Sequence, residues 1–353
     1  MYRILSASKD TYITNKVINN TFRATDANVG QAGTLDLFKL FNESIYTSAS
    51  LSVTSSVSEL SRILVKFDLD PLKKVTGSTL DISHDSFKCY LKLHDVYGGQ
   101  PTPSNFKVIV FPLSKSFDEG IGRDVISFDD LDVANWVTSS VSGDNVTEWF
   151  VTGANRQGLL NSSDIDIISS GTLSGETGAQ LLWSGQTFSK GTEDLNVDIT
   201  TVVSATLKGL IPDYGFRVSF SGSQETDKKS RFVKRFASRH VSDVHKRPQL
   251  IVQYNDSTQD HHEVFQFNVS GSLFLNNFHR SQYANIVSGT SPTRVSGSNS
   301  LLLLLTSGAL ASGTYFSKVV TASQHKIGNN FATGIYSASF AISQWSTGAL
   351  TNQ

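Results

Sequence analysis

The chain is poor in several residue types, and each shortage excludes a class of protein. Cys89 is the only cysteine among 353 residues, which excludes a disulfide framework and a cysteine-based zinc site. Charged residues make up 17% and the formal net charge is −1, so no overall field would recruit nucleic acid or an anionic membrane. The longest purely apolar run, Leu301 to Leu305, is far shorter than the ~18 residues that a membrane span needs. Residues 1–20 lack a basic segment followed by an apolar core, so we expect no secretory signal and synthesis in a cytoplasm.

What the chain does contain favours strands. Hydrophobic residues make up 39%, enough for a packed core, and small polar and β-branched residues are plentiful. We therefore predict an all-β protein. The length predicts two domains, and we place them at 1–256 and 263–353, joined by a polar linker at 257–262.

Alternation of apolar and polar residues predicts half-buried strands packed in a sandwich. In residues 62–69 the odd-numbered side chains would face the core, while Arg62 and Asp68 would face solvent. Residues 106–110 and 216–220 repeat this pattern.

Two short helices are expected to cover sheet edges. Asp198 can cap a helical turn that carries Val202 and Val203, and Gly209 can end it. A second helix is predicted over 128–137, with Trp136 packed against a sheet edge.

Two Ser/Thr-rich stretches look like insertions. They cover 42–60 and 153–180 and lack the proline and charge blocks typical of disorder. We expect extra hairpins or loops that contact other subunits.

The C-terminal region also reads as β-structure. Residues 265–269 and 336–342 alternate, and Leu301 to Leu305 is predicted to be a strand buried on both faces. With fewer than ~100 residues this domain is small for an independent core, so we expect it to bury surface against the first domain or neighbouring subunits.

A series of short motifs runs through the first domain. The last of them leads into an alternating strand at 249–254. In chain order the motif residues are Asp10, Tyr12, Asn28, Gly30, Phe67, Asp68, Asp198, Phe236, Ser238, Arg239, Arg247 and Pro248.

Together, and in this order, these motifs resemble the DNRLRE-type β-sandwich, a jelly-roll-like module related to some carbohydrate-binding modules. The resemblance implies an antiparallel jelly-roll-like sandwich over 1–256. It also implies that Arg239 and Arg247 are structural, and we expect them to bond loop carbonyls and to pair with acids such as Asp68 or Asp198. The chain departs from the pattern at His240, where an acidic residue is usual, so a ligand or metal role for that position is in doubt.

Two groups of residues could suggest a metal. His261 and His262 lie near Asp256 and Asp260, but adjacent histidines on an extended segment point in opposite directions, which favours a solvated linker. The carboxylates at positions 124, 129, 130 and 132 could bind a structural calcium ion, although their spacing is not that of an EF-hand and a helix cap explains them equally well. No cofactor is expected.

Residues 225–247 carry eight basic and three acidic side chains, an excess of +5. Phe232 and Phe236 could stack on bases there. Since the whole chain is nearly neutral, we expect structural ion pairs and no nucleic-acid site.

The four tryptophans, Trp136, Trp149, Trp183 and Trp345, could form a platform for sugars, but aromatic residues in sandwiches more often pack in the core. No Gly-x-Ser-x-Gly motif or phosphate-binding loop is present, and Cys89 reads as a buried, inert thiol. We expect no enzyme and no catalytic residues.

Composition and resemblance together predict a non-enzymatic virion protein of a tailed bacteriophage, in the tail, neck, baseplate or decoration, assembled in the host cytoplasm. Its partners would be other virion proteins and copies of itself, with the C-terminal domain docking or oligomerising. The alternative is a carbohydrate-binding module for host-surface or extracellular glycans. A sugar binder would expose aromatic residues in a groove, whereas a scaffold would bury them.

Overall fold

In a computed structural model the chain divides into two compact units. One comprises Met1–Lys73 and Ile82–Tyr254, and the other Lys74–Asp81 and Asn255–Gln353. The division after Tyr254 lies close to the boundary predicted at residue 256. The structure describes all residues except 49–50, 77–79, 81, 97–104, 127–132, 175–176, 256–259, 265, 290–292, 307–316, 328–329 and 344–353.

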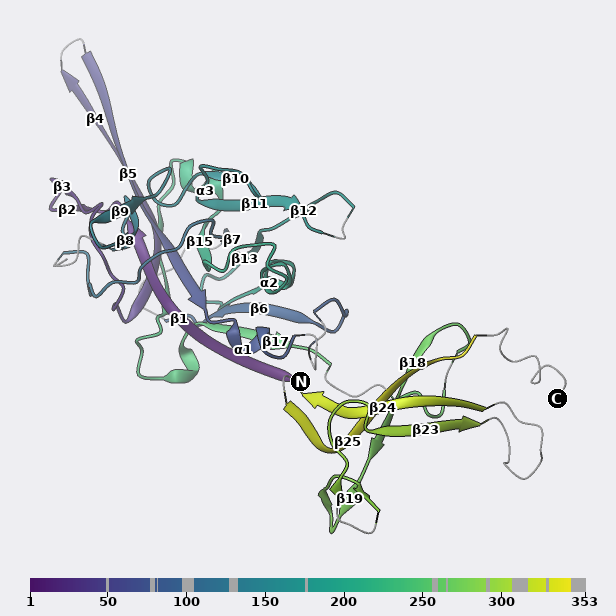
Figure 1. The fold of residues 1–353 in the computed structure, drawn as a ribbon. Helices are drawn as coiled ribbons and strands as arrows, with labels where there is room; N and C mark the ends of the chain where they lie inside the picture. Colours follow the sequence, from purple (N-terminus) through teal and green to yellow (C-terminus); the bar gives the residue numbers. More distant parts are fainter. Residues whose placement is uncertain are drawn as a thin grey trace. The chain divides into compact units, whose positions relative to one another are not determined.

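The first unit is built on one large antiparallel sheet that folds into a sandwich-like arrangement (Figure 1). The strand order is β13-β7-β15-β5-β1-β17-β6-β14, with β4 on β5 and β16 on β4. The prediction of an all-β fold is confirmed. The strands are β1 (Tyr2–Thr14), β4 (Thr34–Ser48), β5 (Leu51–Phe67), β6 (Lys88–Leu93), β7 (Phe106–Pro112), β13 (Ser184–Phe188), β14 (Leu195–Asp198), β15 (Phe216–Phe220), β16 (Arg231–Ala237) and β17 (Gln249–Gln253).

Strand β1 belongs to both layers. Its first part, Tyr2 to Ser6, pairs with β17, and the part from Ala7 to Thr14 pairs with β5. The register shifts between Ala7 and Lys9, and the Ser8 hydroxyl donates to the Lys66 carbonyl at 3.2 Å. A bulge bends a strand and increases its twist, so β1 can turn the corner from one layer to the other.

The predicted inward alternation is confirmed along β5, where Ile63, Val65 and Phe67 are buried. The prediction that Arg62 faces solvent is wrong. Arg62 is buried, binds both carboxylate oxygens of Glu225 at 3.0 and 2.7 Å, and lies over the Trp136 ring. Its charge is paired inside the protein because a further layer covers the outer face of the sheet.

That covering layer comes from residues between β7 and β13. An apolar cluster joins it to the sheet, with Trp136 and Ile167 from the layer and Phe111 from β7. As a result β15 is buried on both faces, and the prediction that it is half-buried is wrong. The predicted insertion at 153–180 supplies a small three-stranded sheet in which β10 and β11 run parallel. The layer holds β8 (Thr138–Ser142), β9 (Asn145–Glu148), β10 (Gln157–Leu159), β11 (Ile167–Thr172) and β12 (Ala179–Leu181).

Helices are short. The predicted one is α2 (Thr200–Leu207), in which the Asp198 carboxylate accepts from the Thr200 amide at 2.8 Å and Gly209 ends the helix at φ +75°. Residues 133–137 form bends, so the second predicted helix is wrong there, and its remainder lies outside the described residues. The others are α1 (Asp70–Lys73), α3 (Gly222–Thr226) and the 3₁₀ turn η1 (Val244–Lys246). Among the described residues no helix has the length and apolar character to span a bilayer.

The second unit is a four-stranded antiparallel sheet in the order β18-β25-β24-β23. One face is packed around Val320, Phe340 and Ile342, with Leu303 and Leu305 against them. The strands are β18 (Ser270–Asn276), β23 (Leu301–Thr306), β24 (Ser317–Ile327) and β25 (Asn330–Ala341). Two-residue strands form the small pairs β19 (Phe278–His279) with β20 (Gln282–Tyr283), β21 (Val287–Ser288) with β22 (Thr293–Arg294) and, in the first unit, β2 (Val17–Ile18) with β3 (Phe22–Arg23).

Three predictions for this unit are wrong. Strand β23 is not buried on both faces, because Leu302 and Leu304 are exposed. Residues 266–269 form a turn and no strand, and Phe265 lies outside the described residues. His261 exchanges hydrogen bonds with Ser272 of β18 at 2.8 and 3.1 Å, so this part of the predicted linker packs along the sheet.

Candidate functional site

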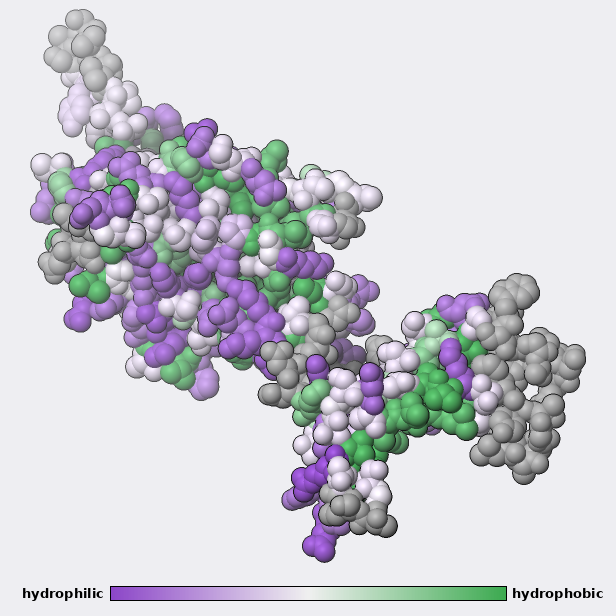
Figure 2. All heavy atoms as spheres, in the orientation of Figure 1, coloured by the Kyte–Doolittle hydropathy of each residue, from purple (hydrophilic) through white to green (hydrophobic). Residues whose placement is uncertain are grey.

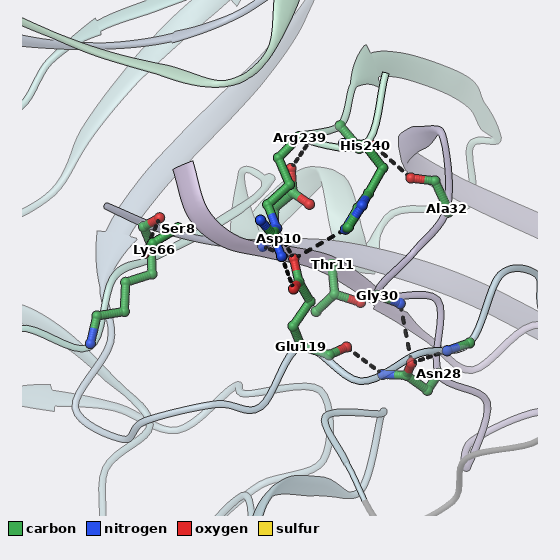
Figure 3. A network of polar contacts seen from close by, with 12 residues as sticks. Ser8, Asp10, Thr11, Asn28, Gly30, Ala32, Lys66, Glu119, Arg239 and His240 are labelled. Carbon is green, nitrogen blue, oxygen red and sulfur yellow. Dashed lines mark hydrogen bonds and ion pairs between the residues drawn. The ribbon is translucent and has the colours of Figure 1, made fainter. Parts of the chain in front are cut away.

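A polar network joins four segments that are far apart in the sequence (Figure 3). Asp10 comes from β1, and Asn28 and Gly30 from the loop before β4. Glu119 follows β7, and Arg239 follows β16. The network therefore ties the bent strand β1 to the loops around it, and five of the sequence-predicted motif residues belong to it: Asp10, Asn28, Gly30, Ser238 and Arg239.

Asp10 is fully buried in this network. Its Oδ2 accepts from the Arg239 amide at 2.6 Å, whereas Oδ1 has no hydrogen-bond partner. Burial raises the pKa of Asp10 to about 7, against the lowering effect of the Arg239 amide and with a further raising contribution from the Glu119 charge. The fold therefore favours a protonated Asp10 up to neutral pH.

Glu119 and Arg239 form a two-pronged ion pair. Arg239 Nε and a terminal nitrogen donate to the two Glu119 oxygens at 2.5 and 2.6 Å, and the Asp10 amide donates to Glu119 Oε1 at 2.9 Å. His240 Nε2 lies 3.5 Å from the same oxygen. Such paired bonds fix geometry as well as charge, so they orient the turn after β16 against β1.

Asn28 holds the other side. Its amide nitrogen donates to the carbonyls of Glu119 and Ala134 at 2.8 and 2.9 Å, and its oxygen accepts from the amides of Gly30 and Gly122 at 3.1 and 2.9 Å. Gly30 must be glycine because a Cβ there would lie 1.9 Å from the Glu119 carbonyl oxygen. The buried amide thus has all its bonds satisfied.

Asp10, Glu119 and His240 each offer one atom that could bind a metal, and these atoms lie within 4.8 Å of one another. A cation does not fit this arrangement well. Both Glu119 oxygens already accept from the Arg239 guanidinium, whose positive charge would oppose a second cation. A proton on Asp10 leaves the Glu119 carboxylate and the Arg239 guanidinium as a balanced pair, so we assign the cluster to a structural network.

The other predicted motif residues lie elsewhere in the first unit. Asp68 is exposed and accepts from the Asp70 amide at 3.0 Å, and Asp198 accepts from the Thr200 amide at the start of α2, whose N-cap is Ile199. Arg247 donates to the Val241 carbonyl at 3.2 and 3.1 Å, and the Pro248 carbonyl accepts from the Ala7 amide. Tyr12, Phe67 and Phe236 are buried in the core. The expected acidic partners of Arg239 were wrong, because it pairs with Glu119 and not with Asp68 or Asp198.

The basic segment 225–247 does not form an open positive face. Its arginines and lysines are mostly paired with carboxylates, and Lys234 is buried. The pairs are Lys228–Glu43, Arg231–Asp227, Lys234–Asp95, Arg235–Asp36 and Arg239–Glu119. This placement matches the structural use expected from the sequence.

Tryptophans do not form a platform in the described residues. Trp136 and Trp149 are buried, and Trp183 is half-buried against Phe111. Trp345 lies outside the described residues, as do Asp129, Asp130 and Asp132 of the possible calcium group and Asp256 of the possible histidine group. Cys89 is buried, and burial raises the pKa of its thiol well above the usual range.

A polar depression of about 470 Å³ lies beside α2. Among its described lining residues are His84, Asp85, Lys88 and Lys208, but no tryptophan or tyrosine. Its described aromatic lining residue is Phe87, which is buried and so offers little of the stacking surface that a sugar site would use.

The hairpin of β4 and β5 is the second feature with functional potential. β16 covers β4 only as far as Lys39, whereas the two strands pair with each other to Ser48 and Leu51. Beyond this support, the described side chains of the hairpin are largely in solvent, among them Ile45, Tyr46 and Val57. We call residues 42–57 the arm. It falls within the predicted insertion at 42–60, for which an extra hairpin was one of the expectations, and it projects from the body of its unit (Figure 1).

Replacing Gly30 by alanine is expected to destabilise the first unit by more than about 2 kcal/mol, because the new methyl group must displace the Glu119 backbone. Gly33→Ala is the matched control, since its Cβ would meet nothing within 4 Å. Urea unfolding measures both variants. Equal stabilities would show that the Asn28–Glu119 contact does not restrain the loop.

Asp10→Asn is expected to flatten the pH dependence of stability. The folded pKa of Asp10, about 7, is above the unfolded value of about 3.9, so its contribution is complete below pH 4 and is lost as the pH rises to 7. Asparagine keeps the bond from the Arg239 amide but does not titrate. Over pH 4–8, with Glu119, Arg239 and His240 unchanged around it, the variant should lose about 4 kcal/mol less unfolding free energy than the wild type, since a shift of about three pKa units is worth about 4 kcal/mol. The control is the exposed Asp144→Asn. Parallel curves for wild type and Asp10→Asn would contradict this assignment.

Models of known protein families give no match to this chain. A search of curated proteins likewise finds no relative. The resemblance to the DNRLRE-type sandwich therefore stays a prediction. Any function must be inferred from the exposed features of this chain.

Proposed function

We propose that this chain is a non-enzymatic structural protein of a tailed-bacteriophage virion, in the tail, neck, baseplate or decoration, and that it works through protein–protein contacts. The observation that carries the proposal is the arm. The arm is a two-stranded extension whose described side chains are mostly exposed and bury little surface within their own unit.

An isolated two-stranded hairpin is marginally stable in water, because it has no second layer against which to pack. The free part of β4, from Asn42 to Ser48, extends for roughly 20 Å at the usual rise of a strand. Its exposed Ile45 and Tyr46 would gain the missing layer from a neighbouring protein. We expect the arm to insert against another virion subunit.

The burial of Trp136 and Trp149 supports a scaffold more than a sugar binder. The carbohydrate-binding module remains the alternative function. Binding of the purified chain on a glycan array, lost when an exposed aromatic residue is replaced, would favour it.

Shortening the arm is expected to abolish incorporation into particles while the fold is kept. The variant joins Phe41 to Ser58 through an Asn-Gly turn, which preserves the pairing of β4 with β16. Incorporation is measured by mass spectrometry of gradient-purified particles. The particles come from a phage in which the tested variant is the only version of this protein.

Leu181→Lys, at an exposed site on β12, is the control for a change in surface hydrophobicity and should enter particles normally. Wild-type chain that stays outside the particles would overturn the virion proposal. Arm-shortened chain that enters particles at the wild-type level would overturn the role of the arm.

A further inference from the structure

The outer strand of the second unit has an open edge. β23 pairs with β24 without any shift of register, from Leu301 with Ala322 to Thr306 with Ser317. On its other side β23 has no strand partner among the residues that the structure describes. Within the described part of the chain, no other backbone group bonds the amides and carbonyls on that side, so they are open to another strand.

This edge lacks the features by which natural proteins discourage pairing. Such features are edge lysines, prolines and bulges. Residues 295–317 contain no charged residue and no proline, and β23 has no bulge. The edge is therefore both open and neutral.

An apolar strip accompanies the edge on the face opposite the core. Leu302 is 73% exposed and Leu304 is 53% exposed, and Val319, which pairs with Leu304, is 58% exposed. Figure 2 shows hydrophobic residues gathered over β23 and β24 of this unit. Leu303 and Leu305 alternate onto the core face. A partner strand would thus cover apolar side chains as well as complete backbone bonds.

We propose that β23 pairs with β23 of a second copy of this chain, antiparallel and centred on Leu303, and so joins the two sheets. The inference rests on the proposed function and names one of its contacts. A two-fold axis perpendicular to a sheet leaves each face of the sheet on the same side in both copies. Paired residues must therefore be both even-numbered or both odd-numbered, because successive residues of a strand alternate between the faces. Centring on Leu303 places Leu302 opposite the partner copy's Leu304 and uses the whole leucine run.

The run itself argues for a second copy over another kind of partner. A strand of five leucines is the same in either direction, so its antiparallel copy matches it in both side-chain size and face. A neutral edge gives no attraction to a charged partner such as nucleic acid, and it gives no repulsion between identical copies. Main-chain bonds add affinity, as in other strand-addition contacts.

Light scattering coupled to size exclusion on the full chain tests the pairing. At about 1–100 µM the wild type should show a concentration-dependent dimer. Leu302→Lys and Leu304→Lys should be monomeric, because each brings a charge to the shared strip. Their unfolding should stay unchanged, since both side chains are exposed in the single chain. Leu181→Lys, on a 67% exposed leucine of the first unit, should still dimerise.

A distance measurement tests the register. Thr306→Cys can be spin-labelled selectively, since Cys89 is buried. Centring on Leu303 puts the two labelled positions six residues apart along the strands, or about 20 Å. A monomeric wild type, a Leu302→Lys dimer or a clearly different distance would overturn the pairing. A monomer that still enters particles would overturn the pairing and leave the proposed function standing. A dimer that is absent from particles would support the pairing and overturn the proposed function.

Discussion

The first unit depends on one strand that serves two layers. β1 pairs with β17 through its first residues and with β5 through the rest, so it must bend at Ser8 and stay bent. The network around Asp10 holds the segment just after this bend, because Asp10 binds Arg239 and its amide binds Glu119. A buried carboxyl with an elevated pKa is tolerated here because its position joins three distant segments.

Beyond this well-supported body, two surfaces are left incomplete. As far as the structure describes the chain, the arm has strand pairing but no second layer, and β23 has a packed face but an open edge and exposed leucines. Both cost the chain stability or solubility when it is alone, since apolar groups and unpaired backbone face water. Both become favourable when a neighbour covers them. These two features are the ground on which we propose a part in an assembly.

Much of the fold was predictable because strand alternation reports burial directly. Ile63, Val65 and Phe67 face the core as their spacing indicates. Periodicity could not show that a covering layer buries Arg62 on the opposite face, nor that the leucines of β23 lie at an edge, because an apolar run reads the same in a central and an outer strand. Motif order indicated Asp10 and Arg239. Glu119 lies in an irregular segment after β7, and no sequence pattern there predicts that it pairs with either residue.

The central claim is that the molecule acts through these two incomplete surfaces. Amide hydrogen exchange, compared between the free chain and the chain within its assembled particle, tests it most directly. In the chain diluted until it is monomeric, the amides of residues 42–57 and the amides of 301–306 on the side away from β24 should exchange fast, and both sets should become strongly protected on assembly. Protection confined to other segments, with both of these unchanged, would contradict the account.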